Sequence, residues 1–511
     1  MRVWGRMARA IMGAAMLMAT AWPAQAAWVR VETDKFIVYG QGGERAVAAY
    51  ATKLNTYDAV LRRFHPSTLD RKPDTKVQVF MVSSRDDLRR VRPRLNRNIA
   101  GFYSAMNEGV FAMALKDGGL GEDDVMFHEY AHHFMWENFP AAYPAWFVEG
   151  WAEYFMTTDI KPAEIKIGGY NTGRAYGIFG ETWIPLEDLL SKTSFETREQ
   201  KRDVYYSLAW LLMHYMRSDP ERAAQLDTAI RAIAEGEDPV KSFEAATGRS
   251  MEDLTQALKK YRRLQILGIK NPGVAVPMKI TTLSRSADDL LLDNLRLMLT
   301  STGETDAGFL AAVRRKAARH PGDAFAEQVL ARAEFVMGDV AAGEAIMKRR
   351  LDANPNGLED QLLAGTGQLL AGMREPKSRE ARFRAARAPI AKAYAMSKTD
   401  FRPLYAYALA RSVEPNFPTD NDMKALLEAR YLAPAVQELS WRAGMALIRK
   451  GQRDEAARVL APVINNPHAG RAAARAREML NSGRIGELEL DEPEDDEEPA
   501  PPGAPPAKPA T

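Results

Sequence analysis

The chain has 511 residues, which is more than one ordinary domain contains, so two or three domains are expected. Hydrophobic residues make up 46% and charged residues 27%, the composition of a globular protein. The formal net charge is only +2, and no basic stripe with interleaved aromatic residues indicates a nucleic acid partner. The chain has no cysteine, which excludes disulfides, a cysteine nucleophile and thiolate-bound zinc.

The first 26 residues have the pattern of a secretory signal. Arginines at positions 2, 6 and 9 precede an apolar run over 11–22, and Ala24-Gln25-Ala26 fits a small-x-small cleavage site. The apolar run is shorter than the roughly 20 residues that cross a bilayer, so no stable membrane span is expected after cleavage. We therefore predict that residues 1–26 are removed and that the mature chain, starting near Ala27, is periplasmic or secreted. An uncleaved signal anchor is the alternative.

Residues 27–268 combine strand-like and helix-like patterns. Short runs rich in β-branched and aromatic residues lie at 29–31, 36–39, 76–82 and 109–115, and helical periodicity covers 46–64. From about 119 to 268 the pattern is mainly helical. This order predicts an α+β domain that consists of a small sheet and a helical subdomain.

The most informative motif is an H-E-x-x-H sequence at 128–132. Residues four apart lie one turn apart on one helix face, so His128 and His132 can bind the same ion. The third ligand must come from another element. Glu149 lies 17 residues after His132, on a helix-like segment beyond a proline-containing turn. Two histidines and a glutamate predict one Zn²⁺ per chain, with a coordination position left open for water as in catalytic zinc sites.

Three further acidic residues have expected roles beside the zinc. Glu129 follows the first histidine and is expected to take a proton from the metal-activated water, as the general base of the reaction. Glu153 lies one turn after Glu149 and is placed to accept a hydrogen bond from a ligand imidazole, which would orient that ring. Asp124, one turn before His128, is a second candidate for the same task.

The two segments together resemble the gluzincin superfamily of zinc metallopeptidases, which includes thermolysin-like and aminopeptidase-N-like enzymes. The resemblance rests on the H-E-x-x-H motif and on Glu149-Gly150-x-Ala152-Glu153-Tyr154, so its specific residues all lie within 128–154. It implies a zincin-like catalytic domain, a peptide or protein substrate, and a tyrosine on a later helix that stabilises an oxyanion. Tyr205 matches that tyrosine best, and Tyr206 is the other candidate.

This sequence departs from the aminopeptidase-N-like pattern before the zinc motif. Those enzymes have a Gly-x-Met-Glu-Asn strand that captures the substrate's amino terminus, whereas this chain has Ala105-Met106-Asn107-Glu108-Gly109. Glu108 is the residue that would bind an amine, but the order is scrambled, so the sequence leaves endo- versus exopeptidase cleavage open. The strand at 109–115 could bind an extended peptide if it lay at a sheet edge.

The second half of the chain predicts helices. Glycine and proline residues make 269–279 a plausible linker, and 280–485 has the pattern of helical hairpins. Pro321 and Pro355 are 34 residues apart, and Pro434 and Pro467 are 33 apart, a period that resembles tetratricopeptide repeats. An irregular helical domain is the alternative. Residues 486–511 are acidic and then rich in proline and alanine, which predicts a disordered tail.

Two hypotheses for the function follow from these features. The first is an exported zinc-dependent peptidase with a tetratricopeptide-like appendage, similar to exported bacterial members of the gluzincin superfamily. The second is a non-catalytic envelope scaffold that binds a protein partner through the concave surface of its repeats. An intact Glu129 favours the peptidase, because a scaffold could hold zinc without it.

Overall fold

The computed structural model describes residues 27–483 apart from 97–98, 117–121, 170–176, 179–181, 198–200, 262, 301–305 and 467–469. The expected signal at 1–26 and the expected tail at 486–511 lie outside the described residues. Among the residues that are described, no helix is both long enough and apolar enough to cross a membrane. The described residues are mostly helical, and two small sheets lie among those up to residue 282.

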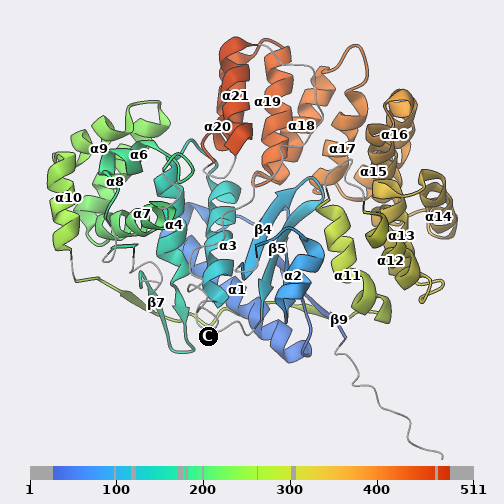
Figure 1. Cartoon of the computed structure of the whole chain (residues 1–511), viewed down its shortest axis with the longest axis horizontal. Helices are drawn as coiled ribbons and strands as arrows, with labels where there is room; N and C mark the ends of the chain where they lie inside the picture. Colours follow the sequence, from blue (N-terminus) through green and yellow to red (C-terminus); the bar gives the residue numbers. More distant parts are fainter. Residues whose placement is uncertain are drawn as a thin grey trace, which may run out of the picture.

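A mixed six-stranded sheet lies at the centre of the molecule (Figure 1). Its strand order is β4-β5-β3-β2-β1-β9, with β2, β3 and β5 parallel to one another and the remaining neighbours antiparallel. Residues of β2 alternate between full burial, as at Phe36 and Val38, and partial exposure, as at Ile37 and Tyr39. The bounds of the strands are β1 Val29–Glu32, β2 Phe36–Gly40, β3 Val77–Val82, β4 Gly101–Met106, β5 Gly109–Leu115 and β9 Lys279–Thr282.

Helices cover both faces of this sheet. On one face lie α1 (Glu44–Phe64) and α3 (Glu122–Asn138), and on the other lie α2 (Arg85–Val91) and α11 (Arg285–Met298). Helix α3, which contains the H-E-x-x-H motif, is attached to α1 by two buried hydrogen bonds. The Tyr57 hydroxyl donates to the Phe127 carbonyl at 3.0 Å, and the Tyr130 hydroxyl donates to Asp58 Oδ1 at 2.8 Å. The sheet and α1 therefore hold α3 in a fixed position.

Among the described residues, further helices and a small antiparallel sheet complete the first part of the chain. Helix α4 contacts α3 on one side and α7 on the other, so it connects the metal motif to this helical group. The sheet has the order β6-β7-β8. The bounds are α4 Ala145–Met156, β6 Asp159–Ile160, β7 Glu164–Ile167, α6 Leu186–Ser191, α7 Arg202–Arg217, α8 Pro220–Ala234, α9 Pro239–Thr247, α10 Met251–Lys260 and β8 Leu267–Lys270.

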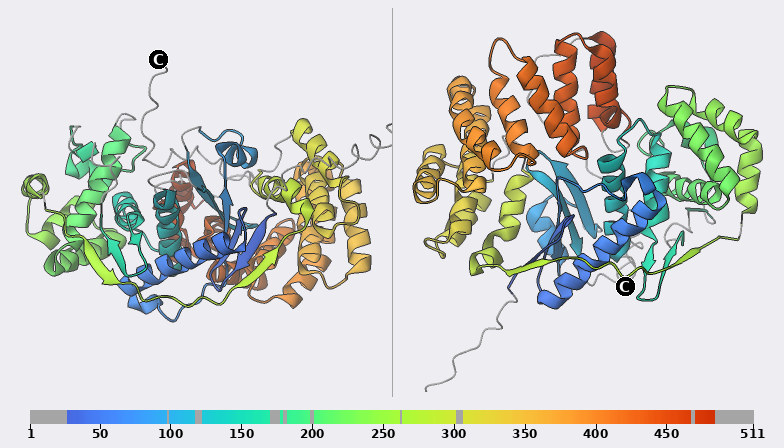
Figure 2. Two further views of the ribbon diagram at one scale, coloured as in Figure 1. Left: turned by 90° about the horizontal axis from the view of Figure 1, so that it is seen from below. Right: turned by 180° about the vertical axis from the view of Figure 1, so that it is seen from behind.

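The segment 269–279, expected to be a linker, takes part in both sheets. Its first residues belong to β8, which pairs with β7, and its last residue begins β9, which pairs with β1. Figure 2 shows this segment as an extended ribbon along one side of the molecule. The glycine and proline residues that indicated a linker lie between the strands. The strands themselves use β-branched residues such as Ile269 and Ile280, which suit extended pairing.

The described residues from 285 to 483 are helical and form antiparallel neighbours along an arc beside the sheet (Figure 1). The helices that follow Pro321 and Pro434 are each paired with the next helix, and turns at Gly338 and Gly451 join them, as the repeat spacing predicts. The bounds are α12 Ala307–Ala317, α13 Ala324–Met337, α14 Val340–Ala353, α15 Leu358–Arg374, α16 Arg379–Met396, α17 Phe401–Arg411, α18 Asp420–Leu432, α19 Gln437–Arg449, α20 Arg453–Ile464 and α21 Gly470–Ser482.

The helical region shares its core with the first part of the chain. One buried cluster includes Val79 of the sheet, Phe127 of α3, and Leu369, Leu404 and Leu439 of the helical region. The secondary structure changes from strand to helix between β9 and α11, whereas the hydrophobic packing continues across this point.

The buried carboxyl of Glu137, near the end of α3, makes stability depend on pH. Burial raises its pKa to about 8, so between about pH 4.5 and 8 the folded state binds more protons than the unfolded state. Stability from this group is present below about pH 4.5 and is lost as the pH rises towards 8. We expect Glu137→Gln to gain stability relative to wild type over this window, with a limiting slope of about 1.4 kcal/mol per pH unit.

Urea denaturation of both proteins at pH 5 and pH 8 measures this difference. The exposed Glu237→Gln is the control, because it removes a carboxylate from the surface and leaves Glu137 in place. A constant difference between Glu137→Gln and wild type at the two pH values would show that the Glu137 carboxyl does not titrate in this range.

Candidate metal centre

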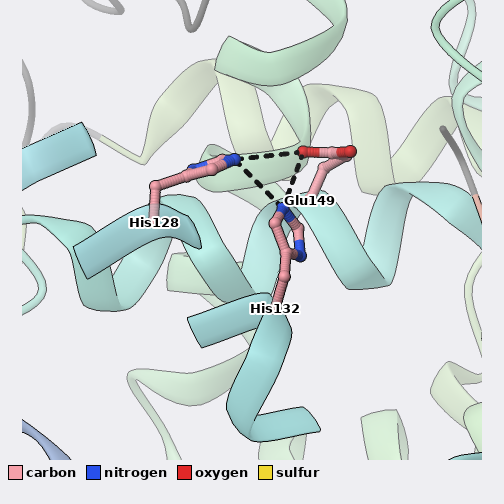
Figure 3. A group of neighbouring side chains, drawn as sticks. All are labelled: His128, His132 and Glu149. Atoms are coloured by element: carbon pink, nitrogen blue, oxygen red, sulfur yellow. Dashed lines mark hydrogen bonds and ion pairs between the residues drawn. The ribbon is translucent and has the colours of Figure 1, made fainter. Parts of the chain in front are cut away.

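Helix α3 brings the two histidines of the motif together. His128 and His132 lie one turn apart, each with only 5% of its surface exposed, and their Nε2 atoms are 3.0 Å apart. Two imidazole nitrogens at this distance point at the same small volume (Figure 3). The sequence spacing predicted this arrangement, because residues four apart share a helix face.

Helix α4 supplies the third group. Glu149 is fully buried, and its Oε2 lies 3.6 Å from the Nε2 of His128 and 3.6 Å from the Nε2 of His132. The chain turns between the two helices at residues 139–144, and α4 begins directly after Pro144. Figure 3 shows the carboxylate facing both rings from the opposite helix.

A neighbouring glycine allows α4 to approach closely enough. A Cβ atom at Gly150 would lie 2.6 Å from the Ala209 carbonyl oxygen and 3.2 Å from Met213 Cβ, both on α7. Any side chain at this position would push α4 away from α7. The Glu-Gly pair of the motif thus combines a ligand with the small residue that permits the packing of its helix.

The three groups fit a bound zinc ion. Their ligand atoms form a triangle with sides of 3.0, 3.6 and 3.6 Å, and the nearest point equidistant from all three corners lies in the plane of the triangle, about 2.0 Å from each. This is the length of a bond from zinc to nitrogen or oxygen. Among the described residues, the triad of His128, His132 and Glu149 is the one group of metal-binding side chains with converging ligand atoms.

Glu153 is placed as its spacing predicts. Its Oε1 lies 3.3 Å from Nδ1 of His128, the ring nitrogen that does not face the triad. A carboxylate at this position fixes the orientation of the imidazole and its tautomer. Asp124 lies one turn before His128 and close to α1, where its charge adds to burial in raising the pKa of Tyr57 well above its usual range. Its expected hydrogen bond to a ligand imidazole stays a prediction.

Glu129 and His133 occupy different surroundings on α3. Glu129 is half-buried beside His128, and its role as general base stays a prediction. His133 is buried and turned towards the sheet, where its Nδ1 lies 2.9 Å from the Tyr103 hydroxyl of β4. Tyr103 is a contact that the sequence analysis missed, because nothing in the local pattern of β4 indicates which helix residue it meets.

The structure gives the Tyr205 hydroxyl a partner away from the triad. Tyr205 of α7 is fully buried, and its hydroxyl donates to the Lys192 carbonyl at 2.7 Å. Burial, and after it the charge of Glu149, hold its pKa well above the usual range, so the hydroxyl keeps its proton. The Tyr206 hydroxyl lies 3.4 Å from Ser194 Oγ. In this conformation the Tyr205 proton is engaged by the backbone, and its role towards an oxyanion stays a prediction.

The sequence left two substrate-binding roles on the sheet open, one for Glu108 and one for the strand at 109–115, and the structure corrects the second. Glu108 forms an ion pair with Arg332 of α13 at 3.0 Å, so its carboxylate is engaged by the helical region instead of being placed to bind a substrate amine. Strand β5 at 109–115 pairs with β3 on one side and β4 on the other, so it is an inner strand whose hydrogen-bonding groups are used. The edge of the sheet on this side is β4.

Comparisons with known proteins add little to this geometry. No family model matches the chain, and no curated protein matches it. Among solved structures, similarity is found to MamA, residues 41 to the end, from Desulfovibrio magneticus RS-1, at 16% sequence identity. The similarity covers 39% of this chain and 97% of that chain with a TM-score of 0.26, a value too low to support an argument about function.

The close contact of Gly150 with α7 predicts that a side chain at this position lowers stability and weakens metal binding. We expect Gly150→Ala to cost about 1–3 kcal/mol of stability, because the added methyl group meets the α7 backbone, and to weaken metal binding by displacing Glu149. Thermal unfolding and zinc titration measure the two effects. Gly308→Ala in α12 is the control, since the nearest atom to its Cβ is 3.4 Å away. Equal behaviour of the two variants would show that the close contact is not needed.

Proposed function

We propose that this protein is an exported zinc-dependent peptidase. The observation that supports it is the convergence of three buried ligand atoms, from His128, His132 and Glu149, on one point at zinc-bond distance. A site of two histidines and one glutamate leaves a coordination position for water, which distinguishes catalytic from structural zinc. The H-E-x-x-H motif and the Glu-Gly-x-Ala-Glu-Tyr segment support peptide hydrolysis through the gluzincin resemblance.

The roles of the residues follow from their positions. A bound zinc ion would lower the pKa of water to about 7. Glu129, next to His128 and partly exposed, would accept the proton of the attacking water and return it to the leaving amine. Glu153 would keep His128 in the tautomer with Nε2 available for the metal. Glu149 supplies the negative charge that offsets part of the charge of a divalent cation.

The first test is the metal content of the protein. We expect elemental mass spectrometry of the purified chain to find about one zinc per chain. Glu149→Gln is expected to lose it, because the amide cannot supply the negative ligand atom. Asp123→Asn is the control and is expected to keep the zinc, because the Asp123 carboxylate pairs with Lys53 and is not one of the three ligands. Wild-type protein that holds no metal and takes up none from added zinc would contradict the proposal.

The second test separates metal binding from proton transfer. We expect Glu129→Gln to keep its zinc and to hydrolyse a peptide library about 10²- to 10⁴-fold more slowly than wild type. Asp123→Asn, which removes another carboxylate from α3, is expected to retain wild-type activity. Cleavage by Glu129→Gln at the wild-type rate would refute the assigned base.

The alternative function is a non-catalytic envelope scaffold that acts through the helical region. The observation that favours it is an open hollow of about 530 Å³ along α18–α20, next to Tyr431, whose surface is 67% exposed. Apolar side chains such as Met423 and Leu427 line this hollow together with charged ones such as Lys424 and Glu428, a mixture that suits a protein contact. This hypothesis predicts normal function in the cell for Glu129→Gln, whereas the peptidase hypothesis predicts its loss.

A further inference from the structure

The tip of the β4–β5 hairpin lies against the inner face of the helical region. This inner face is the side of α13, α15 and α17 that is turned towards the sheet. The turn residues Asn107 and Glu108 border a small cavity of about 40 Å³, whose other walls include Leu369 of α15 and Tyr405 of α17. On its other side the turn borders a polar cavity of about 490 Å³. The hairpin tip thus occupies the concave side of the helices, which repeat proteins commonly use to bind peptides.

An ion pair joins the hairpin tip to this inner face. Arg332 Nη1 of α13 lies 3.0 Å from Glu108 Oε1, and the two side chains are only 11% and 16% exposed. An ion pair this far from solvent is weakly screened, and removal of one partner leaves the other charge poorly solvated. The two residues are more than 220 positions apart in the sequence, so the pair joins the helical region directly to the sheet.

The same hairpin reaches the helix that contains the metal ligands. Strand β4 forms the edge of the six-stranded sheet and has β5 as its strand partner. Its Tyr103 places the hydroxyl 2.9 Å from Nδ1 of His133, the residue directly after the ligand His132. The contacts therefore run from Arg332 to Glu108, along β4 to Tyr103, and from there to α3.

We propose that Arg332 is a positioning residue for the metal centre, which it stabilises through Glu108 and the β4–β5 hairpin. The inner face of the helical region is thus a receptor for the chain's own acidic turn. Loss of the ion pair frees the hairpin tip, loosens β4 at the sheet edge and weakens the hold of Tyr103 on α3. The effect on zinc rests on the proposed function, but the effect on β4 and α3 does not.

Hydrogen exchange and zinc release together test this proposal in the full chain. We expect Arg332→Gln and Glu108→Gln each to speed amide exchange in β4 and in α3, and to speed zinc loss to a chelator about three- to tenfold. The double variant is expected to show the same amide exchange and zinc loss as either single variant, because both substitutions remove the same ion pair. Arg332→Lys, which keeps a cation beside Glu108, is expected to restore most of the wild-type behaviour.

A matched control separates the positioning role from general destabilisation. Arg350 of α14 and Asp360 of α15 form a similarly buried pair, 2.8 Å apart with side chains 10% and 4% exposed, within the helical region. Arg350→Gln is expected to lower stability but to leave exchange in β4 and α3 unchanged. Unchanged exchange in Arg332→Gln, or equal effects of Arg332→Gln and Arg350→Gln on β4, would overturn the proposal. A wild-type chain without zinc would overturn the peptidase function, and the exchange result would still decide on Arg332.

Discussion

The close approach of α4 to α7 is the constraint on which the candidate metal centre depends. Glu149 is fully buried, and it meets the two histidines because Gly150, the next residue, lets α4 pack against the Ala209 carbonyl of α7. A Cβ at this position would lie 2.6 Å from that carbonyl oxygen, so α4 or α7 would have to shift. The position of Glu149 therefore depends on the absence of a side chain at Gly150, the residue that follows it.

The opposite side of the centre is fixed by a different set of contacts. Helix α3 is held by the sheet and by α1, through the hydrogen bonds of Tyr57 and Tyr130. Asp58, which accepts the bond from Tyr130, also binds Arg62 at 2.8 Å and Lys35 at 2.7 Å, so its buried charge is compensated. The two histidines and the glutamate thus come from two helices with independent supports, and the triad forms where those supports meet.

Local spacing predicted most of the triad, and tertiary contacts account for what the sequence did not show. The separation of His128 and His132 determines their distance on any helix, and Glu153 follows Glu149 by one turn for the same reason. The ion pair of Glu108 with Arg332 joins residues from distant parts of the chain, and no pattern around either residue indicates the other. The pairing of β9 with β1 was missed for the same reason, because glycine and proline residues conceal a strand that begins after them.

The shared core bears on both functional hypotheses. Strand β9 completes the central sheet immediately before α11, and α11 covers one face of that sheet, so the chain cannot be divided at residue 280 without exposing buried side chains. Leu404 and Leu439 of the helical region belong to the same buried cluster as Phe127, the residue before His128. A helical region built into the core in this way is a structural part of the unit that contains His128, His132 and Glu149. Part of its inner face is occupied by the protein's own hairpin, beside a polar cavity of about 490 Å³.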